Sequence, residues 1–131
     1  MQLASQSVMV WMWLTVLAAP STSQAQSTQE MLSFCRAVSA SKTTSEGVAL
    51  PRDFESGVCW GAFAAIQAVI VRARPGEQPF LLVCAPPKST RLQLIAVFVR
   101  YSEDHPNRLH EDFMDVALDS LRQAFPCPRP R

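Results

Sequence analysis

The chain has 131 residues, of which 48% are hydrophobic and 18% are charged, and its formal net charge is +1. This near-neutral balance gives no reason to expect binding to nucleic acid or to an anionic membrane surface. The length is that of one small domain rather than several.

The first 25 residues resemble a cleaved secretory signal rather than part of the fold. Residues 8–19 form an apolar run, VMVWMWLTVLAA, that is too short to span a bilayer comfortably. The small-x-small triplet Ser23-Gln24-Ala25 suits signal peptidase. No Lys or Arg precedes Arg36, so a retained anchor is the alternative. We predict a signal peptide over residues 1–25 and an exported chain that begins near Gln26 and needs no membrane after cleavage.

All four cysteines, Cys35, Cys59, Cys84 and Cys127, lie in the mature part of the chain. An even cysteine count in an exported protein predicts two disulfides, for which three connectivities are possible. A domain of this size buries roughly two thirds of its surface on folding, which gives marginal stability. Each disulfide typically contributes about 2–4 kcal/mol, so we expect the bridges to stabilise the fold.

The first half of the mature chain predicts two helices, over residues 28–40 and 53–72. Ser27 and Glu30 fit a capping box before the first helix, and Asp53 is a candidate N-cap for the second. Residues 42–52 between them form a polar loop. Gly57 and Gly61 lie one turn apart in the second helix. Because glycine costs a helix about 1 kcal/mol relative to alanine, we expect a neighbouring backbone to approach closely there.

The second half predicts a short extended segment and two further helices. Residues 80–84, FLLVC, form an apolar run that we interpret as a buried extended lead-in, since it has no obvious partner strand. Thr90 and Gln93 fit a second capping box. This cap favours a helix over residues 91–101, although β-branched residues there also permit a strand. The chain after Cys127, residues 128–131, is predicted to be a disordered tail.

The last predicted helix is the most strongly patterned and covers residues 105–127. Apolar residues recur at steps of three and four from Leu109 to Phe125, and acidic residues fill the other face. Pro106 suits the first turn of a helix, and Pro126 ends it. The pattern as a whole predicts an all-α fold, a small four-helix bundle-like domain over residues 26–127.

Helices joined by short loops usually pack antiparallel as neighbours, and this rule predicts the disulfide pairing. The end of the first helix then lies beside the start of the second, which pairs Cys35 with Cys59. The outer ends of the last two helices also meet, which pairs Cys84 with Cys127. The alternative pairing, Cys35–Cys127 with Cys59–Cys84, requires residues 80–84 to run back along the second helix.

A catalytic or metal site formed by cysteines and histidines is possible on paper, but the sequence does not favour it. Cys59 or Cys84 would act as a nucleophile with His105 or His110 as base, or the same residue types would bind zinc. An even cysteine count favours disulfides instead, and histidines five residues apart do not have metal-ligand spacing on a helix. We expect no enzyme, cofactor or metal.

The acidic stretch around the last predicted turn has two interpretations. The simpler one is a solvated helix face, and the other is a docking surface for a basic partner. The candidate partner surface consists of Glu103, Asp104, His105, His110 and Glu111.

An ordered set of short motifs runs through the mature chain. It comprises Cys35, then Cys59-Trp60-Gly61, Val83-Cys84-Ala85-Pro86, Thr90 to Gln93, Tyr101 to Pro106, and Ala124-Phe125-Pro126-Cys127. In this order the chain resembles the Tai/Rap immunity proteins of bacterial type VI secretion.

The resemblance implies a small periplasmic helical protein that neutralises a peptidoglycan-amidase toxin by blocking its active site. A small disulfide-bonded periplasmic chaperone or stress protein is the alternative. The second and third helices are apolar over more than one stripe, so we also expect a homodimer or a complex with a partner protein.

Overall fold

The computed structural model of the protein describes residues 26–70 and 79–128. The predicted signal peptide, residues 1–25, lies outside the described residues, as does the predicted tail apart from Pro128.

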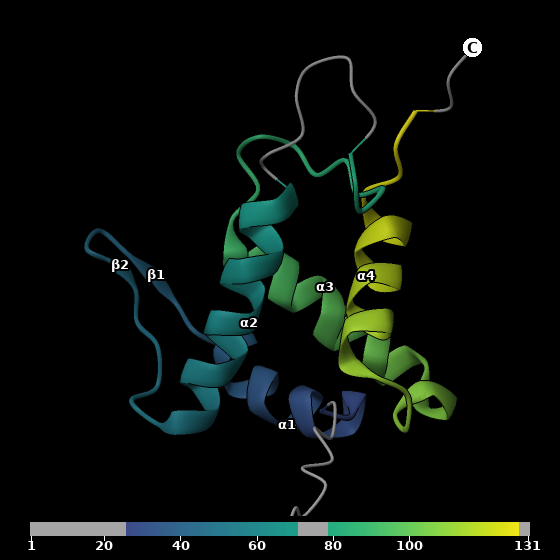
Figure 1. Cartoon of the computed structure of the whole chain (residues 1–131). Coiled ribbons are helices and arrows are strands. Elements are labelled where there is room, and N and C mark those ends of the chain that lie inside the picture. Colours follow the sequence, from purple (N-terminus) through teal and green to yellow (C-terminus); the bar gives the residue numbers. More distant parts are fainter. Residues whose placement is uncertain (1–25, 71–78, 129–131) are drawn as a thin grey trace, which may run out of the picture.

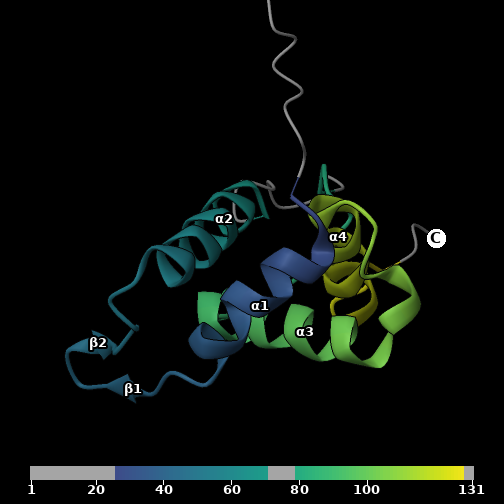
Figure 2. The same ribbon diagram turned by 90° about the horizontal axis from the view of Figure 1, so that it is seen from below.

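Four α-helices make up most of the described fold: α1 (Thr28–Ser39), α2 (Phe54–Ile70), α3 (Arg91–Asp104) and α4 (Phe113–Ala124). Figure 1 shows α2 and α4 on either side of α3, with α1 across one end, and Figure 2 shows α1 alongside α3. The prediction of an all-α domain with four helices is confirmed. None of the helices in the described ranges combines the length and apolar composition that crossing a bilayer requires.

Three aromatic rings join α2, α3 and α4 at the centre of the core. The ring centroids of Phe63 and Phe98 lie 5.6 Å apart, and Phe113 lies 5.8 Å from Phe63 and 5.3 Å from Phe98. These separations are those of favourable tilted and edge-to-face aromatic pairs. The triad is surrounded by buried aliphatic side chains of all four helices, including Met31, Val38, Ile66, Leu94, Ile95, Val116 and Leu121.

Both predicted disulfides are present with the predicted pairing. Cys35–Cys59 joins α1 to α2, and Cys84–Cys127 joins the segment before α3 to the chain just after α4. The Cα atoms lie 5.4 Å apart in Cys35–Cys59 and 5.0 Å apart in Cys84–Cys127, which is within the range that a disulfide needs. Two neighbouring pairs of helices are therefore each closed by one bridge.

The predicted caps begin three of the helices. Ser27 accepts a hydrogen bond from the Glu30 N–H at 3.3 Å, and Asp53 accepts one from the Ser56 N–H at 2.7 Å. The capping box of Thr90 and Gln93 is complete, since each side chain accepts from the backbone N–H of the other. Helix α3 continues to Asp104, three residues beyond its predicted end.

The prediction of one helix over residues 105–127 is wrong. A 3-10 helix, η1, covers Pro106–Arg108, and α4 begins only at Phe113. The Leu109 carbonyl, which a continuous helix would pair with the Phe113 N–H, instead accepts from the Gln29 N–H at 2.9 Å. The Phe113 N–H donates to the Gln26 carbonyl at 3.0 Å. Tertiary backbone bonds to the start of α1 therefore replace the helical bonds at this point.

The same contact fixes the new start of α4. Thr28 is fully buried, and its N–H and hydroxyl both donate to the Glu111 carbonyl, at 2.9 Å and 3.0 Å. Asp112 adopts an extended backbone, and its side chain accepts from the Met114 N–H at 2.8 Å. Asp112 is thus the N-cap of α4. The helix ends at Ala124, close to the stop predicted from Pro126.

The polar loop at residues 42–52 contains a small hairpin that the sequence did not reveal. Strands β1 (Thr43–Thr44) and β2 (Gly47–Val48) pair antiparallel, with Thr43 opposite Val48. Gly47 has φ +128°, a conformation that glycine adopts more easily than other residues. The hairpin projects from the helical body between α1 and α2 (Figure 1).

The expectation of a close backbone contact at Gly57 and Gly61 is wrong. A Cβ atom added at either glycine would have no neighbouring heavy atom within 4 Å among the described residues. Both positions are on the exposed face of α2. The packing within the described chain therefore does not require glycine at either position.

Residues 79–84 lie against the end of α4, but the prediction that residues 80–84 are buried is only partly right, because Phe80 is 92% exposed and Leu82 is 46% exposed. Val83 is buried and forms a single β-bridge with Pro126, and the Cys84 N–H donates to the Phe125 carbonyl at 2.9 Å. Arg122 Nε donates to the Leu81 carbonyl at 3.0 Å. Leu82 has φ 55°, so the backbone turns sharply within the segment rather than staying extended throughout.

Candidate partner-binding surface

The five residues predicted as a partner surface lie at the end of α3 and in its connection to α4. Glu103 and Asp104 end α3, and His105 is its C-cap. His110 and Glu111 lie in the turn between η1 and α4. The five residues fall in two short runs separated by residues 106–109, and the turn is held at the start of α1 by the hydrogen bonds of Thr28 and Gln29.

Arg108 of η1 holds this connection in one conformation. Its guanidinium donates to the Glu111 carboxylate at 2.7–3.0 Å, to Asp119 Oδ2 at 3.0 Å and to the Tyr101 hydroxyl at 2.8 Å. Charge-assisted bonds of this forked kind are the strongest and most directional in proteins. Arg108 therefore ties η1 to α3 through Tyr101 and to α4 through Asp119.

Sequence reasoning missed this role of Arg108. The three-residue spacing of Arg108 and Glu111 is a local signal for an ion pair that the sequence analysis did not use. The contacts of Arg108 with Tyr101 and Asp119 depend on the fold and have no local signal.

The carboxylates of the candidate surface are paired with arginines of the same chain. Glu103 lies 3.0 Å from Arg36 of α1, and Asp104 lies 4.0 Å from Arg100. The hydrogen bonds that Arg108 donates to Glu111 are the main reason that the pKa of Glu111 is lowered, and the same bonds are the main reason that the pKa of Arg108 is raised. The surface therefore offers a basic partner less uncompensated negative charge than the acidic sequence pattern indicated.

His105 is held by Tyr101. The two rings stack, with centroids 4.0 Å apart and planes 19° apart, and His105 Nδ1 lies 2.7 Å from the Tyr101 carbonyl oxygen. A carbonyl only accepts hydrogen bonds, so Nδ1 is the donor. In the neutral ring, Nε2 is then left as an acceptor. His110 is exposed in the following turn.

The alternative catalytic and zinc sites are not assembled by the fold. Cys59 and Cys84 are each bonded in a disulfide, so neither offers a thiolate nucleophile. Among residues 26–70 and 79–128, no three His, Cys, Asp or Glu side chains are placed to hold a metal ion.

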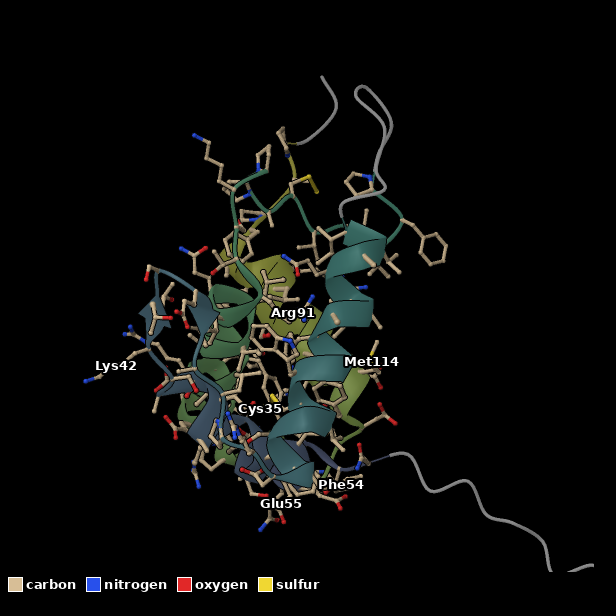
Figure 3. The ribbon with its side chains drawn as sticks, turned by 90° about the vertical axis from the view of Figure 1, so that its left-hand side faces the viewer. Cys35, Lys42, Phe54, Glu55, Arg91 and Met114 are labelled. Atoms are coloured by element: carbon tan, nitrogen blue, oxygen red, sulfur yellow. A yellow bond between two sulfur atoms is a disulfide. The ribbon has the colours of Figure 1, made fainter. Side chains whose placement is uncertain are left out.

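Several large apolar side chains other than the five candidate-surface residues are exposed, and the sequence analysis did not identify them. Phe54 is 81% exposed and Phe80 is 92% exposed. Val69, Leu82 and Met114 are also exposed. Figure 3 shows Phe54 at one end of α2, beside Glu55, and Met114 at the edge of the molecule. Helical periodicity indicates which face is apolar, but it does not identify apolar residues at helix ends and in loops that remain uncovered.

Comparison with known proteins identifies the family. The model of the Rap1a immunity proteins matches residues 27–127, a range that includes all four helices and all four cysteines. No curated protein and no solved structure gives a significant match. The match confirms the resemblance to Tai/Rap immunity proteins that the ordered motifs indicated. The chain therefore belongs to the family of Rap1a immunity proteins.

Proposed function

We propose that this immunity protein binds a peptidoglycan-amidase toxin in the periplasm and blocks the active-site cleft of the toxin. The observation that carries the proposal is the family match over residues 27–127. The amidase as target follows from the likeness of the ordered cysteine and proline motifs to those of Tai/Rap proteins. Blocking a cleft requires a rigid surface and no catalytic group in the inhibitor.

The described fold is suited to such binding. Two disulfides close its helix pairs, and Arg108 fixes the connection between α3 and α4. A surface that is already ordered loses little conformational entropy on binding, which favours affinity. We propose that Glu103, Asp104, His105, His110 and Glu111 contact the toxin. Because the three carboxylates are paired within the chain, we expect recognition to depend mainly on shape and on hydrogen bonds of the histidines.

We also propose a periplasmic location with cleavage of residues 1–25. Support comes from the small-x-small triplet before Gln26 and from the two disulfides, which persist in oxidising compartments. Mass spectrometry of the exported protein is expected to find Gln26 at the N-terminus. Recovery of the full-length chain in the membrane fraction would contradict this location.

Homodimer formation is part of the proposal. Phe54, Val69, Phe80, Leu82 and Met114 are exposed in the single chain, and large exposed apolar side chains favour association. Sedimentation of the mature chain at micromolar concentration is expected to show a dimer. A strict monomer that also fails to capture a toxin would contradict both the dimer and the proposed inhibition.

The proposed inhibition is tested by titrating the mature chain into a peptidoglycan-amidase assay. The first toxin to test is any amidase-like hydrolase that is found encoded beside the gene for this chain. Amidase activity is expected to fall linearly to zero at a simple stoichiometric ratio, as tight occlusion requires. Unchanged amidase activity at a large excess of the chain, together with suppressed aggregation of unrelated proteins, would instead support a chaperone.

The contact surface is tested in the same assay with a double variant, His105→Ala with His110→Ala. We expect this variant to inhibit at least about tenfold more weakly, as loss of central contacts does. The matched control is Lys88→Ala, which lies before the opposite end of α3, about 20 Å away along the helix. Full inhibition by the double variant would contradict the proposed contact surface, but it would not contradict the proposed inhibition of the toxin.

A further inference from the structure

The two disulfides differ in how well solvent reaches them. Cys35 and Cys59 are both 0% exposed, within the core between α1 and α2. Cys84 and Cys127 are both partly exposed, at the end of the molecule where α4 ends. Cys35 is labelled in Figure 3 among the helices. Since a disulfide exchanges only when a thiolate reaches one of its sulfur atoms, the two bridges are expected to react at different rates.

The chain around the exposed bridge is also held by contacts that do not involve sulfur. The Cys84 N–H donates to the Phe125 carbonyl at 2.9 Å, and Val83 pairs with Pro126. Val83 is 1% exposed, so its side chain anchors the segment in the core. Arg122 Nε adds the bond to the Leu81 carbonyl. Breaking the exposed bridge therefore removes a cross-link without removing the contacts that place the segment.

The Cys35–Cys59 bridge, in contrast, can be reached only by disturbing the core packing. A reductant reaches Cys35 or Cys59 only when α1 and α2 separate, because both residues are packed among Met31, Val38 and Phe63 in the same core cluster. Openings of this kind in core helices approach the free energy of global unfolding, whereas openings at the edge of a fold are much easier. Reduction of Cys35–Cys59 is therefore coupled to unfolding.

We propose that Cys84–Cys127 is a thiol–disulfide exchange site in the folded protein, open to a dithiol reductant or a dithiol oxidoreductase. One thiolate of the dithiol attacks a sulfur of the bridge and forms a mixed disulfide, and the other cysteine leaves as a thiolate and takes a proton. The second thiol of the dithiol then attacks the mixed disulfide. Two electrons and two protons pass to Cys84 and Cys127, and the dithiol becomes a disulfide.

This exchange has a defined structural consequence. It opens a cross-link between residues 43 apart in sequence, while the backbone contacts of Phe125 and Pro126 with the segment before α3 remain. Cys35–Cys59, which spans 24 residues, continues to join α1 to α2. The exchange site is separate from the candidate partner-binding surface, because Cys84 precedes α3 and that surface follows it. The proposal therefore does not depend on the identity of a toxin.

The experiment follows thiol labelling of the folded mature chain in dithiothreitol. Samples are quenched with iodoacetamide at intervals and mapped by peptide mass spectrometry, while far-ultraviolet circular dichroism records helix content. We expect Cys84 and Cys127 to become labelled at least about tenfold faster than Cys35 and Cys59, with an unchanged helical signal. Labelling of all four cysteines together with loss of helix, or earlier labelling of Cys35 and Cys59, would overturn the proposal.

A double variant, Cys84→Ser with Cys127→Ser, provides the second test. We expect it to keep the helical signal and to show no fast labelling, while Cys35 and Cys59 stay bonded. Loss of helical structure in this variant would contradict the claim that the sulfur-independent contacts hold the segment. The labelling rates of the unmodified chain are a separate result, and the behaviour of this variant does not change their interpretation.

Discussion

Ser102 carries a hydroxyl group that is fully buried in α3 and has no hydrogen-bond partner among the described residues. A buried polar group without a partner lowers the free energy of unfolding, because it has lost its bonds to water. We predict that Ser102→Ala raises the free energy of unfolding by about 0.5–1 kcal/mol. Urea unfolding followed by circular dichroism measures this change.

The matched control for Ser102 is Ser120, which is also buried but whose hydroxyl donates to the Ala117 carbonyl at 2.7 Å. Ser120→Ala removes the same hydroxyl from a helix and also loses a hydrogen bond. We expect Ser120→Ala to be less stabilising than Ser102→Ala. Equal effects of the two substitutions would show that the missing partner of Ser102 has no energetic cost.

Glu111 makes stability depend on pH in a definite direction. Its pKa in the folded chain lies below the ordinary value of 4.5, chiefly because Arg108 donates hydrogen bonds to its carboxylate. The stabilisation is therefore fully present above about pH 4.5 and is lost as the pH falls through the lowered pKa of the folded state. We predict that Glu111→Gln destabilises the protein near pH 7 and that the difference from the unmodified chain shrinks in acid.

Urea titrations at several pH values test this prediction for Glu111. A difference in free energy of unfolding that stays constant from neutral to acidic pH would mean that Arg108 does not favour the ionised carboxylate. The predicted pH dependence comes from Glu111 alone. It is therefore measured as the difference in free energy of unfolding between the unmodified chain and Glu111→Gln, not from the acid denaturation of either protein.

At the scale of the elements, the exposed glycines of α2 make a direct prediction. Gly57 and Gly61 have open space where a Cβ atom would lie, so alanine fits without a clash and restricts the unfolded chain. We predict that Gly57→Ala and Gly61→Ala each raise the free energy of unfolding by about 0.5–1 kcal/mol. The control is Gly47→Ala in the hairpin, which is expected to destabilise because Gly47 has φ +128°. Thermal unfolding of the three variants measures these changes. Equal effects of alanine at the two α2 positions and at Gly47 would contradict the prediction.

The helices that the sequence predicted well are those whose ends carry local signals. The side chains of Ser27, Asp53 and Thr90 cap backbone N–H groups close by in sequence, so a short stretch of residues determines where α1, α2 and α3 begin. The start of α4 was misplaced because its cause is distant. The Leu109 carbonyl accepts from the Gln29 N–H and not from the Phe113 N–H. The apolar residues keep a helical spacing from Leu109 onward, although α4 begins only at Phe113. The strands of the hairpin have two residues each, which is too short for an alternating pattern to be recognised.

At the scale of the whole molecule, the disulfide pairing was predictable because it follows from the order of the elements. Consecutive helices pack beside one another, and each bridge joins two segments that this packing brings together. The position of the five candidate-surface residues was predictable only in part, since they are close in sequence but His110 and Glu111 lie in a turn and not in the predicted helix. The pairing of Glu103 with Arg36, and of Arg108 with Asp119, depends on tertiary contacts that a single sequence does not encode locally.

The measurement that tests the central claim most directly is protection of living cells from the toxin. The amidase toxin under test is exported to the periplasm of a host cell, where it is expected to lyse the cell by cleaving peptidoglycan. Co-expression of the chain with residues 1–25 is expected to prevent lysis, and the same chain without residues 1–25 is expected to give no protection. Lysis that proceeds unchanged when the exported, disulfide-bonded chain is present in excess would contradict the account of this protein as the inhibitor of that amidase.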